Sequence, residues 1–418
     1  MKPALLASGY SQLQSLPDIH VPLIGNRWAI GIFFLVHVVF GSFTMGTIFL
    51  SPTYQLVGRR RGDPRFGRYA RGLAEVNVKI FSLGATIAGF AVILLTALYP
   101  RFFIPLVERF FWAFLIAFVV WIPAIAALYL YVYQWDRLEP RHPRLHLSLG
   151  YYAAAFEHVF LVMIVGIDSY LLTPGAGHGL AAFFNQSYFP ELGHRFTGNI
   201  SWASFFIAGV SAVRASAARD TGDRAYHAWA TRASMVVGFL TLVVQVILGF
   251  AFAEAVKSAS PGAFTYSVSG PFAWLWLVQG LLLAVLVIGS NVYFQQTRPT
   301  PPGRAMTWAV VGLSVIAVAP APLYPHGYFW VRYIVLLASV VVSVVHFLDW
   351  RRQSERLPGA EMERAPRTTM ALVAGSALTI FLLMGIIRTT ARGEFTVYGK
   401  QTESQSYGLY SPPAGHYP

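Results

Sequence analysis

Cysteine is absent from this 418-residue chain, and charged residues are scarce. Without cysteine, the chain cannot form a disulfide, hold an iron–sulfur cluster or attach a c-type heme covalently. Only 12% of the residues are charged and 56% are hydrophobic, which excludes an ordinary soluble domain of this length. Any metal or cofactor must therefore take its ligands from histidine, methionine, glutamate or aspartate.

Acidic residues are outnumbered by basic ones, 18 against 31, which gives a net charge of +13. The basic residues are unevenly spread, and this argues against nucleic acid as the partner. Twenty of them fall in five connections that would share one membrane face, and seven fall on the opposite side, tails included. The positive-inside rule then predicts that both termini lie outside.

Long apolar stretches fill the rest of the chain, and most reach the length of about 20 residues that a membrane helix needs. The ten stretches run over 28–50, 76–98, 110–133, 148–172, 195–217, 230–254, 271–294, 305–321, 328–349 and 370–388. The eighth, closed by Pro320 and Pro322, is the shortest. The sequence predicts an all-α, multi-pass bundle of about ten transmembrane helices in a bacterial inner membrane, surrounded by lipid.

Four regions are expected along the chain. They are an outer N-terminal segment over 1–27, a six-helix bundle over 28–254, four further helices over 255–388 and an outer tail over 389–418. The first segment lacks the basic, apolar and small-residue parts of a signal peptide. The tail is rich in Ser, Gly, Tyr and Pro, which favours an extended segment that a partner subunit orders.

Histidines stand out within the apolar stretches, because an ionisable residue in hydrocarbon marks either a structural pair or a functional site. His37 lies ten residues into the first stretch, at a depth of about 15 Å from the outer face. His158 lies deeper, beside Glu157. His194 opens the fifth stretch, and His326 stands just before the ninth. All four histidines are expected in the outer half of the membrane.

Arginines are expected at the same level, at the outer ends of helices: Arg195, Arg332, Arg388 and Arg392. A b-type heme takes one or two axial ligands from the protein, and arginine pairs well with its propionates. Histidines and arginines at one level therefore favour heme binding over simple hydrogen bonds between helices.

The segment from Asn26 to Gly46 resembles the first helix of subunit I of the cytochrome bd quinol oxidases. In that family an arginine precedes the active-site heme histidine by ten residues, as Arg27 precedes His37 here. The resemblance is good over about residues 1–255 and patchier beyond. Further similar segments are Glu75–Phe81 with Lys79, Trp135–Leu138, Tyr170–Pro174, Gly193–Asp220, Phe329–Arg332 and Ala391–Gly399.

Several positions depart from the family pattern. The methionine that ligates the family's low-spin heme is replaced by Ile334, and the glutamate ligand of its second active-site heme falls at Thr389. The two acidic residues of the third helix that are thought to feed protons fall at about Ile116 and Ala124. The resemblance therefore implies a divergent relative.

The family's long outer loop that handles quinol is reduced here to Ala255–Gly270, and two extra helices follow it. A segment this short predicts that quinol is not oxidised in the usual manner. A periplasmic cytochrome c is then favoured as the electron partner. A partner subunit is expected to dock on 271–321 and 401–418.

The resemblance assigns His194 to a low-spin heme, and we expect Arg332 and Arg195 at its propionates. His326 is the candidate for the second ligand, because it lies at the same level and Ile334 cannot ligate iron. Arg392, in the segment that stands for a family motif, is a further heme-binding candidate. His37 and His158 together would give a bis-histidine heme. Alternatively, His37 alone would bind a high-spin heme, with Glu157 and His158 delivering protons, or His158 would only bond a neighbouring helix.

We therefore expect an oxidoreductase subunit that binds one to three b-type hemes non-covalently, with heme d less expected. It would move electrons at the periplasmic face, together with other membrane subunits of a respiratory complex. One alternative is a divergent terminal oxidase that reduces dioxygen. A proton-coupled transporter is less favoured, because internal repeats and helices broken at midplane are not evident.

Overall fold

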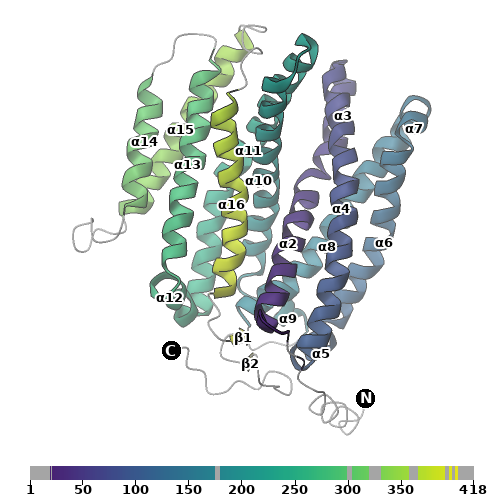
Figure 1. Cartoon of the computed structure of the whole chain (residues 1–418), viewed down its shortest axis with the longest axis vertical. Helices are drawn as coiled ribbons and strands as arrows, with labels where there is room; N and C mark the ends of the chain where they lie inside the picture. Colours follow the sequence, from purple (N-terminus) through teal and green to yellow (C-terminus); the bar gives the residue numbers. More distant parts are fainter. Residues whose placement is uncertain are drawn as a thin grey trace. The chain divides into compact units, whose positions relative to one another are not determined.

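The computed structural model describes residues 19, 21–174, 179–298, 304–319, 331–356, 366–390, 395–397 and 401–402, which are almost entirely helical (Figure 1). The helices are α2 (Gly25–Thr47), α3 (Leu50–Arg61), α4 (Pro64–Leu98), α5 (Pro100–Arg109), α6 (Phe111–Tyr133), α7 (Trp135–Arg141), α8 (Pro143–Leu172), α9 (Leu180–Phe183), α10 (Tyr188–Ala217), α11 (Thr221–Ala259), α12 (Pro261–Ser269), α13 (Trp274–Gln296), α14 (Arg304–Val318), α15 (Val331–Arg356) and α16 (Arg367–Thr390). Two short strands, β1 (Phe395–Val397) and β2 (Gln401–Thr402), pair antiparallel. The expected all-α class is confirmed.

Nine helical segments within the described residues are long and apolar enough to cross a membrane. The first, Trp28–Arg61, joins α2 and α3, because Ile48 and Phe49 between them keep right-handed helical backbone angles. The eighth expected stretch, 305–321, corresponds to α14, whose 15 residues give a helix of about 22 Å. That is shorter than a hydrocarbon core of about 30 Å. The prediction of about ten helices thus corresponds to nine spans and one shorter apolar helix.

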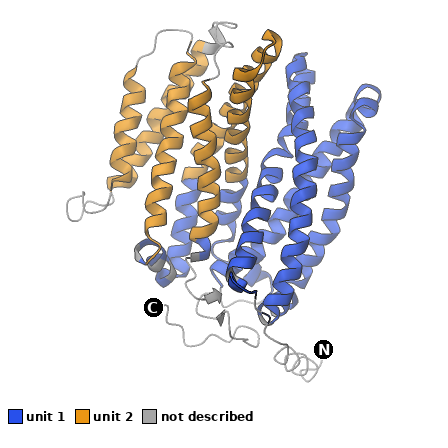
Figure 2. Cartoon of the chain, viewed as in Figure 1, with its two compact units in different colours: residues 1–196, 247–270, 388–418 blue, residues 197–246, 271–387 orange. Residues whose placement is uncertain are grey.

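The chain divides into two compact units (Figure 2). Unit 1 comprises residues 1–196, 247–270 and 388–418, and unit 2 comprises 197–246 and 271–387. The division passes through α10 and α11, and the expected four-region organisation stays a prediction. His37, Glu157, His158, His194 and Arg195 all belong to unit 1.

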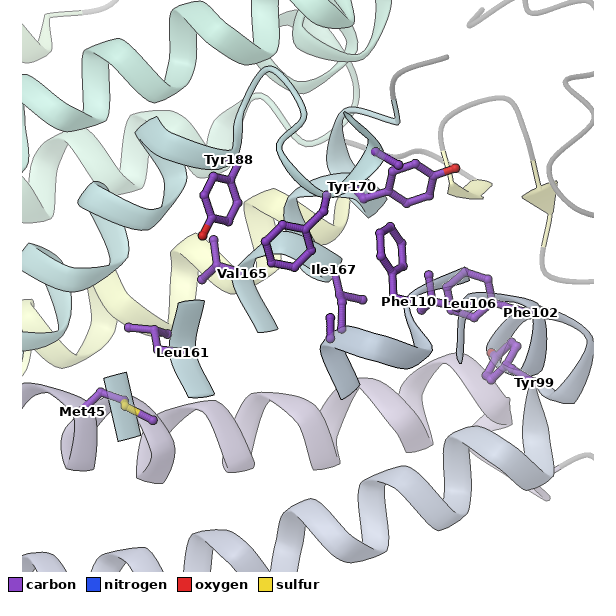
Figure 3. Close-up of a cluster of buried hydrophobic side chains, with 13 residues drawn as sticks. Met45, Tyr99, Phe102, Leu106, Phe110, Leu161, Val165, Ile167, Tyr170 and Tyr188 are labelled. Carbon is purple, nitrogen blue, oxygen red and sulfur yellow. The ribbon is translucent and has the colours of Figure 1, made fainter. Parts of the chain in front are cut away.

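An apolar cluster closes one end of unit 1, where α5, α6, α8 and α9 meet (Figure 3). The Phe110 ring packs edge-on against Tyr170, with 5.1 Å between ring centroids. Gly166 of α8 lies directly under Phe183, because an added Cβ would come within 2.1 Å of the Phe183 ring. A side chain at this position would displace α9, so the glycine is needed for the close approach.

Small residues also bring the helices of unit 2 together, as is common where helices associate in lipid. A Cβ added to Gly209 of α10 would lie 2.4 Å from the Cβ of Ala374 on α16. Polar contacts join α13 to α15: the His346 Nδ1 lies 2.9 Å from the Asn291 Oδ1, and the Asn291 amide donates to Ser343.

Asp63 caps the N-terminus of α4, and the contacts around it predict a pH-dependent contribution to stability. Its carboxylate accepts the backbone N–H of Arg65 at 3.0 Å and pairs with the Arg65 guanidinium at 2.8 Å. The side-chain hydrogen bond from Arg65 is the largest cause that lowers the pKa of Asp63. We expect Asp63→Ala to reduce the free energy of unfolding by about 1 kcal/mol in detergent.

This contribution should be complete above about pH 5 and decline as the pH falls toward the lowered pKa of the folded state, because protonation removes the charged acceptor. Asp63→Asn is the matched control, since asparagine caps a helix about as well but does not titrate. Equal pH dependence of unfolding in the Asp63→Asn variant and the wild type would contradict this assignment.

Candidate functional site

His37 is held in one orientation by the neighbouring helix. Its Nδ1 lies 3.1 Å from the backbone carbonyl oxygen of Gly84 on α4. A carbonyl only accepts hydrogen bonds, so Nδ1 carries the proton and the lone pair is on Nε2. Gly84 also allows the close approach, because an added Cβ would lie 2.8 Å from the Cβ of Phe40. Histidines that ligate metals are commonly oriented by such a bond through the other ring nitrogen.

His158 lies elsewhere in unit 1. Its Nδ1 donates to the carbonyl of Ala154 at 2.7 Å, within its own helix, and its ring packs between Phe49 and Phe196 at centroid distances of 6.5 and 5.1 Å. Phe49 follows His37 by twelve residues, a rise of about 18 Å along the helix. The structure therefore does not bring His37 and His158 to one level, and the bis-histidine alternative finds no support in this geometry.

Glu157, next to His158, is buried and only partly satisfied. It is 2% exposed, and its Oε1 has no hydrogen-bond partner among the described residues. Two of the other unit 1 side chains with such an atom lie on the neighbouring helices α2 and α4. They are Thr44 of α2, through its hydroxyl, and Asn77 of α4, through both amide atoms. Three buried polar residues on three helices thus retain unused hydrogen-bonding capacity.

His194 lies in the first turns of α10 and contacts α11. A Cβ added to Gly249 would lie 3.2 Å from the Cε1 and 3.4 Å from the Nδ1 of His194, so the glycine admits the imidazole against the backbone of α11. The Phe252 ring lies 5.8 Å from the imidazole. A half-buried histidine with a glycine below it and an aromatic ring beside it suits one axial position of a porphyrin.

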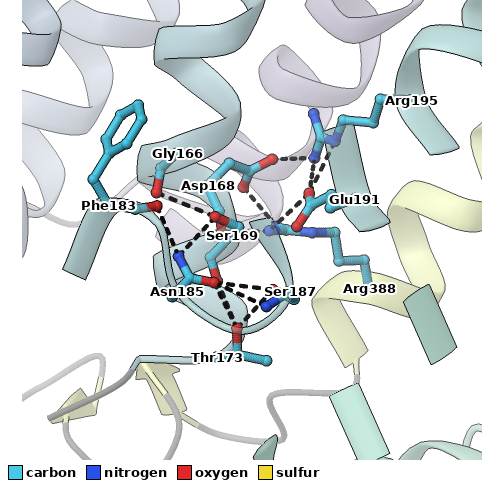
Figure 4. A network of polar contacts seen from close by, with 10 residues as sticks. All are labelled: Gly166, Asp168, Ser169, Thr173, Phe183, Asn185, Ser187, Glu191, Arg195 and Arg388. Carbon is cyan, nitrogen blue, oxygen red and sulfur yellow. Dashed lines mark hydrogen bonds and ion pairs between the residues drawn. The ribbon is translucent and has the colours of Figure 1, made fainter. Parts of the chain in front are cut away.

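Arg195 joins a cluster of four charged residues that also contains Asp168, Glu191 and Arg388 (Figure 4). Arg195 pairs with Asp168 and, at 2.9 Å, with Glu191. Arg388 pairs with Asp168 at 2.7 Å and with Glu191 at 3.5 Å. Glu191 is 1% exposed, so both arginines compensate its buried charge. If Arg195 also paired with a heme propionate, its guanidinium would have to bind a third carboxylate in addition to Asp168 and Glu191.

The remaining candidates are Arg332, His326 and Arg392, together with the position of the family's methionine. Arg332 opens α15 in unit 2, where its guanidinium lies 5.9 Å from the Tyr333 ring centroid. Its pairing with a heme at His194 stays a prediction. His326 and Arg392 lie outside the described residues. Ile334, at the position of the family's methionine, is 56% exposed.

The donor atoms present fit single-histidine heme ligation better than a protein-only metal site. No group of three or more His, Asp or Glu side chains that could hold a metal ion occurs within the described ranges. His37 offers an Nε2 lone pair fixed by Gly84, and His194 has a glycine-lined position beside α11. Heme iron needs only one or two protein ligands, which these residues supply.

Sequence reasoning overlooked part of the charged cluster. The four-residue spacing of Glu191 and Arg195 on one helix is the signal that would have indicated their pairing. The participation of Arg388 has no such local signal, because it lies 220 residues from Asp168. His346 of α15, within the ninth stretch, is 0% exposed and bonded to Asn291.

Comparison with known proteins gives a match to a family model and matches to solved structures. A family model described as cytochrome bd terminal oxidase subunit I matches residues 26–265. A solved structure of bd oxidase from Geobacillus thermodenitrificans is similar in fold, with a TM-score of 0.54 and 14% sequence identity. This similarity covers 88% of this chain and 95% of that one. No curated protein matches the chain in sequence.

The charged cluster leads to a prediction about stability. Replacing Arg195 with methionine leaves the buried Glu191 with a single arginine, and breaking a buried ion pair costs about 3 kcal/mol. We expect the unfolding free energy of Arg195→Met in detergent to fall by about that amount.

The matched control is Lys257→Met, which removes an exposed pair with Glu254 at 3.3 Å. Exposed pairs contribute less than about 1 kcal/mol, so this variant should unfold like the wild type. Adding Glu191→Gln to Arg195→Met should restore part of the lost stability. Equal losses in the two single variants would show that burial of Glu191 does not matter.

Proposed function

Because the chain belongs to the cytochrome bd terminal oxidase subunit I family, we propose that it is a heme-b-binding membrane subunit of a respiratory electron-transfer complex. The observation that carries the proposal is His37, which lies inside the first span with Nδ1 bound to a backbone carbonyl at 3.1 Å. This bond directs an Nε2 lone pair away from the α4 backbone, as an axial ligand requires.

His37 and His194 are the residues that would hold heme iron, and heme supplies one-electron redox chemistry. The protein contributes orientation. The Gly84 carbonyl fixes the tautomer and ring plane of His37, and the backbone at Gly249 limits the rotation of His194. Arg332 and Arg392 are the arginines proposed for propionates, whereas Arg195 and Arg388 mainly compensate Glu191 and Asp168.

The segment 255–270 supports an electron partner other than quinol. It consists of the end of α11 and the nine-residue helix α12, Pro261–Ser269. This leaves little chain for a separate quinol-binding insert. We propose that electrons pass at the predicted outer face, near His194, to or from a periplasmic cytochrome c, in a complex with other membrane subunits.

Replacing the proposed ligands tests the assignment. His37→Ala and His194→Ala should each lower the ratio of heme to protein and remove a different part of the reduced-minus-oxidised optical spectrum. His142→Ala is the matched control, because His142 lies exposed between α7 and α8. Helicity measured by circular dichroism should be unchanged in all three. Unchanged heme content in both ligand variants would show that other residues bind the heme.

The donor can be tested separately. In stopped-flow mixing, a short-chain quinol should reduce the purified protein far more slowly than a reduced cytochrome c, because no quinol-binding insert is present. Rapid reduction by quinol that a quinol-site inhibitor blocks would overturn this part of the proposal.

A further inference from the structure

Polar side chains follow one face of the first span from its middle to its charged end. The positions are spaced by three or four residues, which places them in a row along a helix. The row, called here the polar stripe, contains His37, Thr44, Thr47, Ser51, Gln55 and Arg59, with Gly41 filling the turn between His37 and Thr44. Thr44, Thr47, Ser51 and Gln55 are each no more than 2% exposed. Buried polar residues are costly inside a membrane, so four in a row require an explanation.

The half of the polar stripe that ends at Arg59 is hydrogen-bonded to other helices. Ser51 donates to the carbonyl of Ala70 at 2.8 Å and lies 3.2 Å from the Tyr131 hydroxyl. Tyr131 donates to Gln55 at 3.0 Å, and Gln55 in turn bonds His146 at 2.8 Å. These contacts link α3, α4, α6 and α8.

The charged end of the polar stripe reaches the surface. Arg59 pairs with Glu139 at 3.2 Å, and their side chains are 26% and 35% exposed. The hydrogen-bonded half of the polar stripe therefore begins at groups that meet water. The charge distribution predicts that this end faces the inside of the cell.

The half of the polar stripe toward His37 is different, because Thr44 faces Asn77 without a bond between them. Two contacts fix the antiparallel register of this span against α4: His37 with Gly84 and Ser51 with Ala70. Thr44 lies seven residues from both His37 and Ser51, and Asn77 lies seven residues from both Gly84 and Ala70. Seven residues make about two helical turns, so Thr44 and Asn77 lie on the faces that meet.

Glu157 reaches the same level from α8. The bond between Gln55 and His146 sets the register of these two helices. Thr44 precedes Gln55 by eleven residues and Glu157 follows His146 by eleven, which is about three turns in each helix. Thr44, Asn77 and Glu157 therefore converge from three helices, and four of their polar atoms lack partners among the described residues.

This arrangement of Thr44, Asn77 and Glu157 is stable only if another group forms hydrogen bonds with their unpartnered atoms. A buried donor or acceptor without a partner costs about 1–3 kcal/mol, and hydrocarbon supplies no substitute. A buried water needs two to four polar partners, and this group of side chains provides them on three sides. Apolar side chains cannot hydrogen-bond these atoms. A metal ion does not fit either, since the three residues offer only a hydroxyl, an amide and a single carboxyl group.

From these observations we infer that the polar stripe, with Asn77 and Glu157 at its end, is a hydrated proton-uptake route that leads to the His37 site. This inference rests on the proposed function, because it supplies protons to the site where His37 would hold heme. It assigns the route to the first span, whereas the family's third-helix acids fall at Ile116 and Ala124, of which Ala124 is 0% exposed.

The transfer balances in charge and atoms. A proton from water enters near Arg59 and Glu139, and each water or hydroxyl along the polar stripe accepts one proton and releases another. The last proton forms an O–H bond with the Glu157 carboxylate. The heme that His37 would hold supplies one-electron redox chemistry, and one electron from an added reductant that releases no proton, such as hexaammineruthenium(II), would compensate this charge.

The absence of cysteine from the chain allows a direct test of water access. A single introduced thiol gives an isolated S–H infrared band, and its exchange in deuterated water reports contact with water or mobile protons. Thr47→Cys and Ser51→Cys place the thiol in the polar stripe, and Ala124→Cys is the matched control in the third span. All three positions are buried at 2% exposure or less.

We expect the thiols at 47 and 51 to exchange at least about tenfold faster than the thiol at 124, because exchange at 124 requires local opening of the bundle. Adding Gln55→Leu to Thr47→Cys should slow the exchange. Equal rates at all three positions, or faster exchange at 124, would overturn the inference.

A second measurement connects the route to reduction. When a one-electron reductant that releases no proton, such as hexaammineruthenium(II), reduces the purified protein in weak buffer, a pH indicator should report proton uptake that Glu157→Gln abolishes while the optical spectrum is retained. Uptake that survives Glu157→Gln would exclude Glu157 as the acceptor. A protein without heme bands would refute the proposed function, whereas thiol exchange would still decide whether the route exists.

Discussion

Hydrocarbon offers no hydrogen bonds, so each polar group of this chain within the bilayer must be satisfied by the protein or by water. This constraint explains why the spans are helical, since a helix satisfies its own backbone. It also explains where the polar side chains lie. His37 bonds a backbone carbonyl, Glu191 lies between two arginines, and Asn291 joins two neighbours. Thr44, Asn77 and Glu157 are among the described residues with an unpartnered buried polar atom, and their convergence from three helices makes them the most informative residues of unit 1.

The two ends of unit 1 are specialised in different ways. One end holds the charged cluster around Glu191 and, in the same helix, His194. The other end holds Arg59 and Glu139, and one helical turn deeper Gln55 begins a set of hydrogen bonds that includes Tyr131 and Ser51. His37 lies between these ends. Electrons would therefore reach the His37 site from the predicted outer face and protons from the predicted inner face, with both routes built from residues of the same unit.

Much of this fold could be predicted from the sequence, because long apolar stretches leave few alternatives to helices. The main difference between the expected and the observed helices is the length of α14, because Pro320 and Pro322 in the sequence do not show where this helix ends. Contacts between distant helices were beyond local patterns. Nothing near Asp168 indicates Arg388, and nothing near Thr44 indicates Asn77. The family resemblance pointed to His37 and His194, but the glycines that position them, Gly84 and Gly249, became evident only from the packing.

Heme binding at His37 and His194 is the central claim, and the optical spectrum of the purified wild-type protein tests it most directly. The spectrum should be recorded in the oxidised state and after reduction by dithionite, together with extraction of the porphyrin. We predict b-type absorption bands and porphyrin that acidified solvent removes, since the chain has no cysteine to retain it covalently. A well-folded, helical protein without these bands and without extractable porphyrin would contradict the claim.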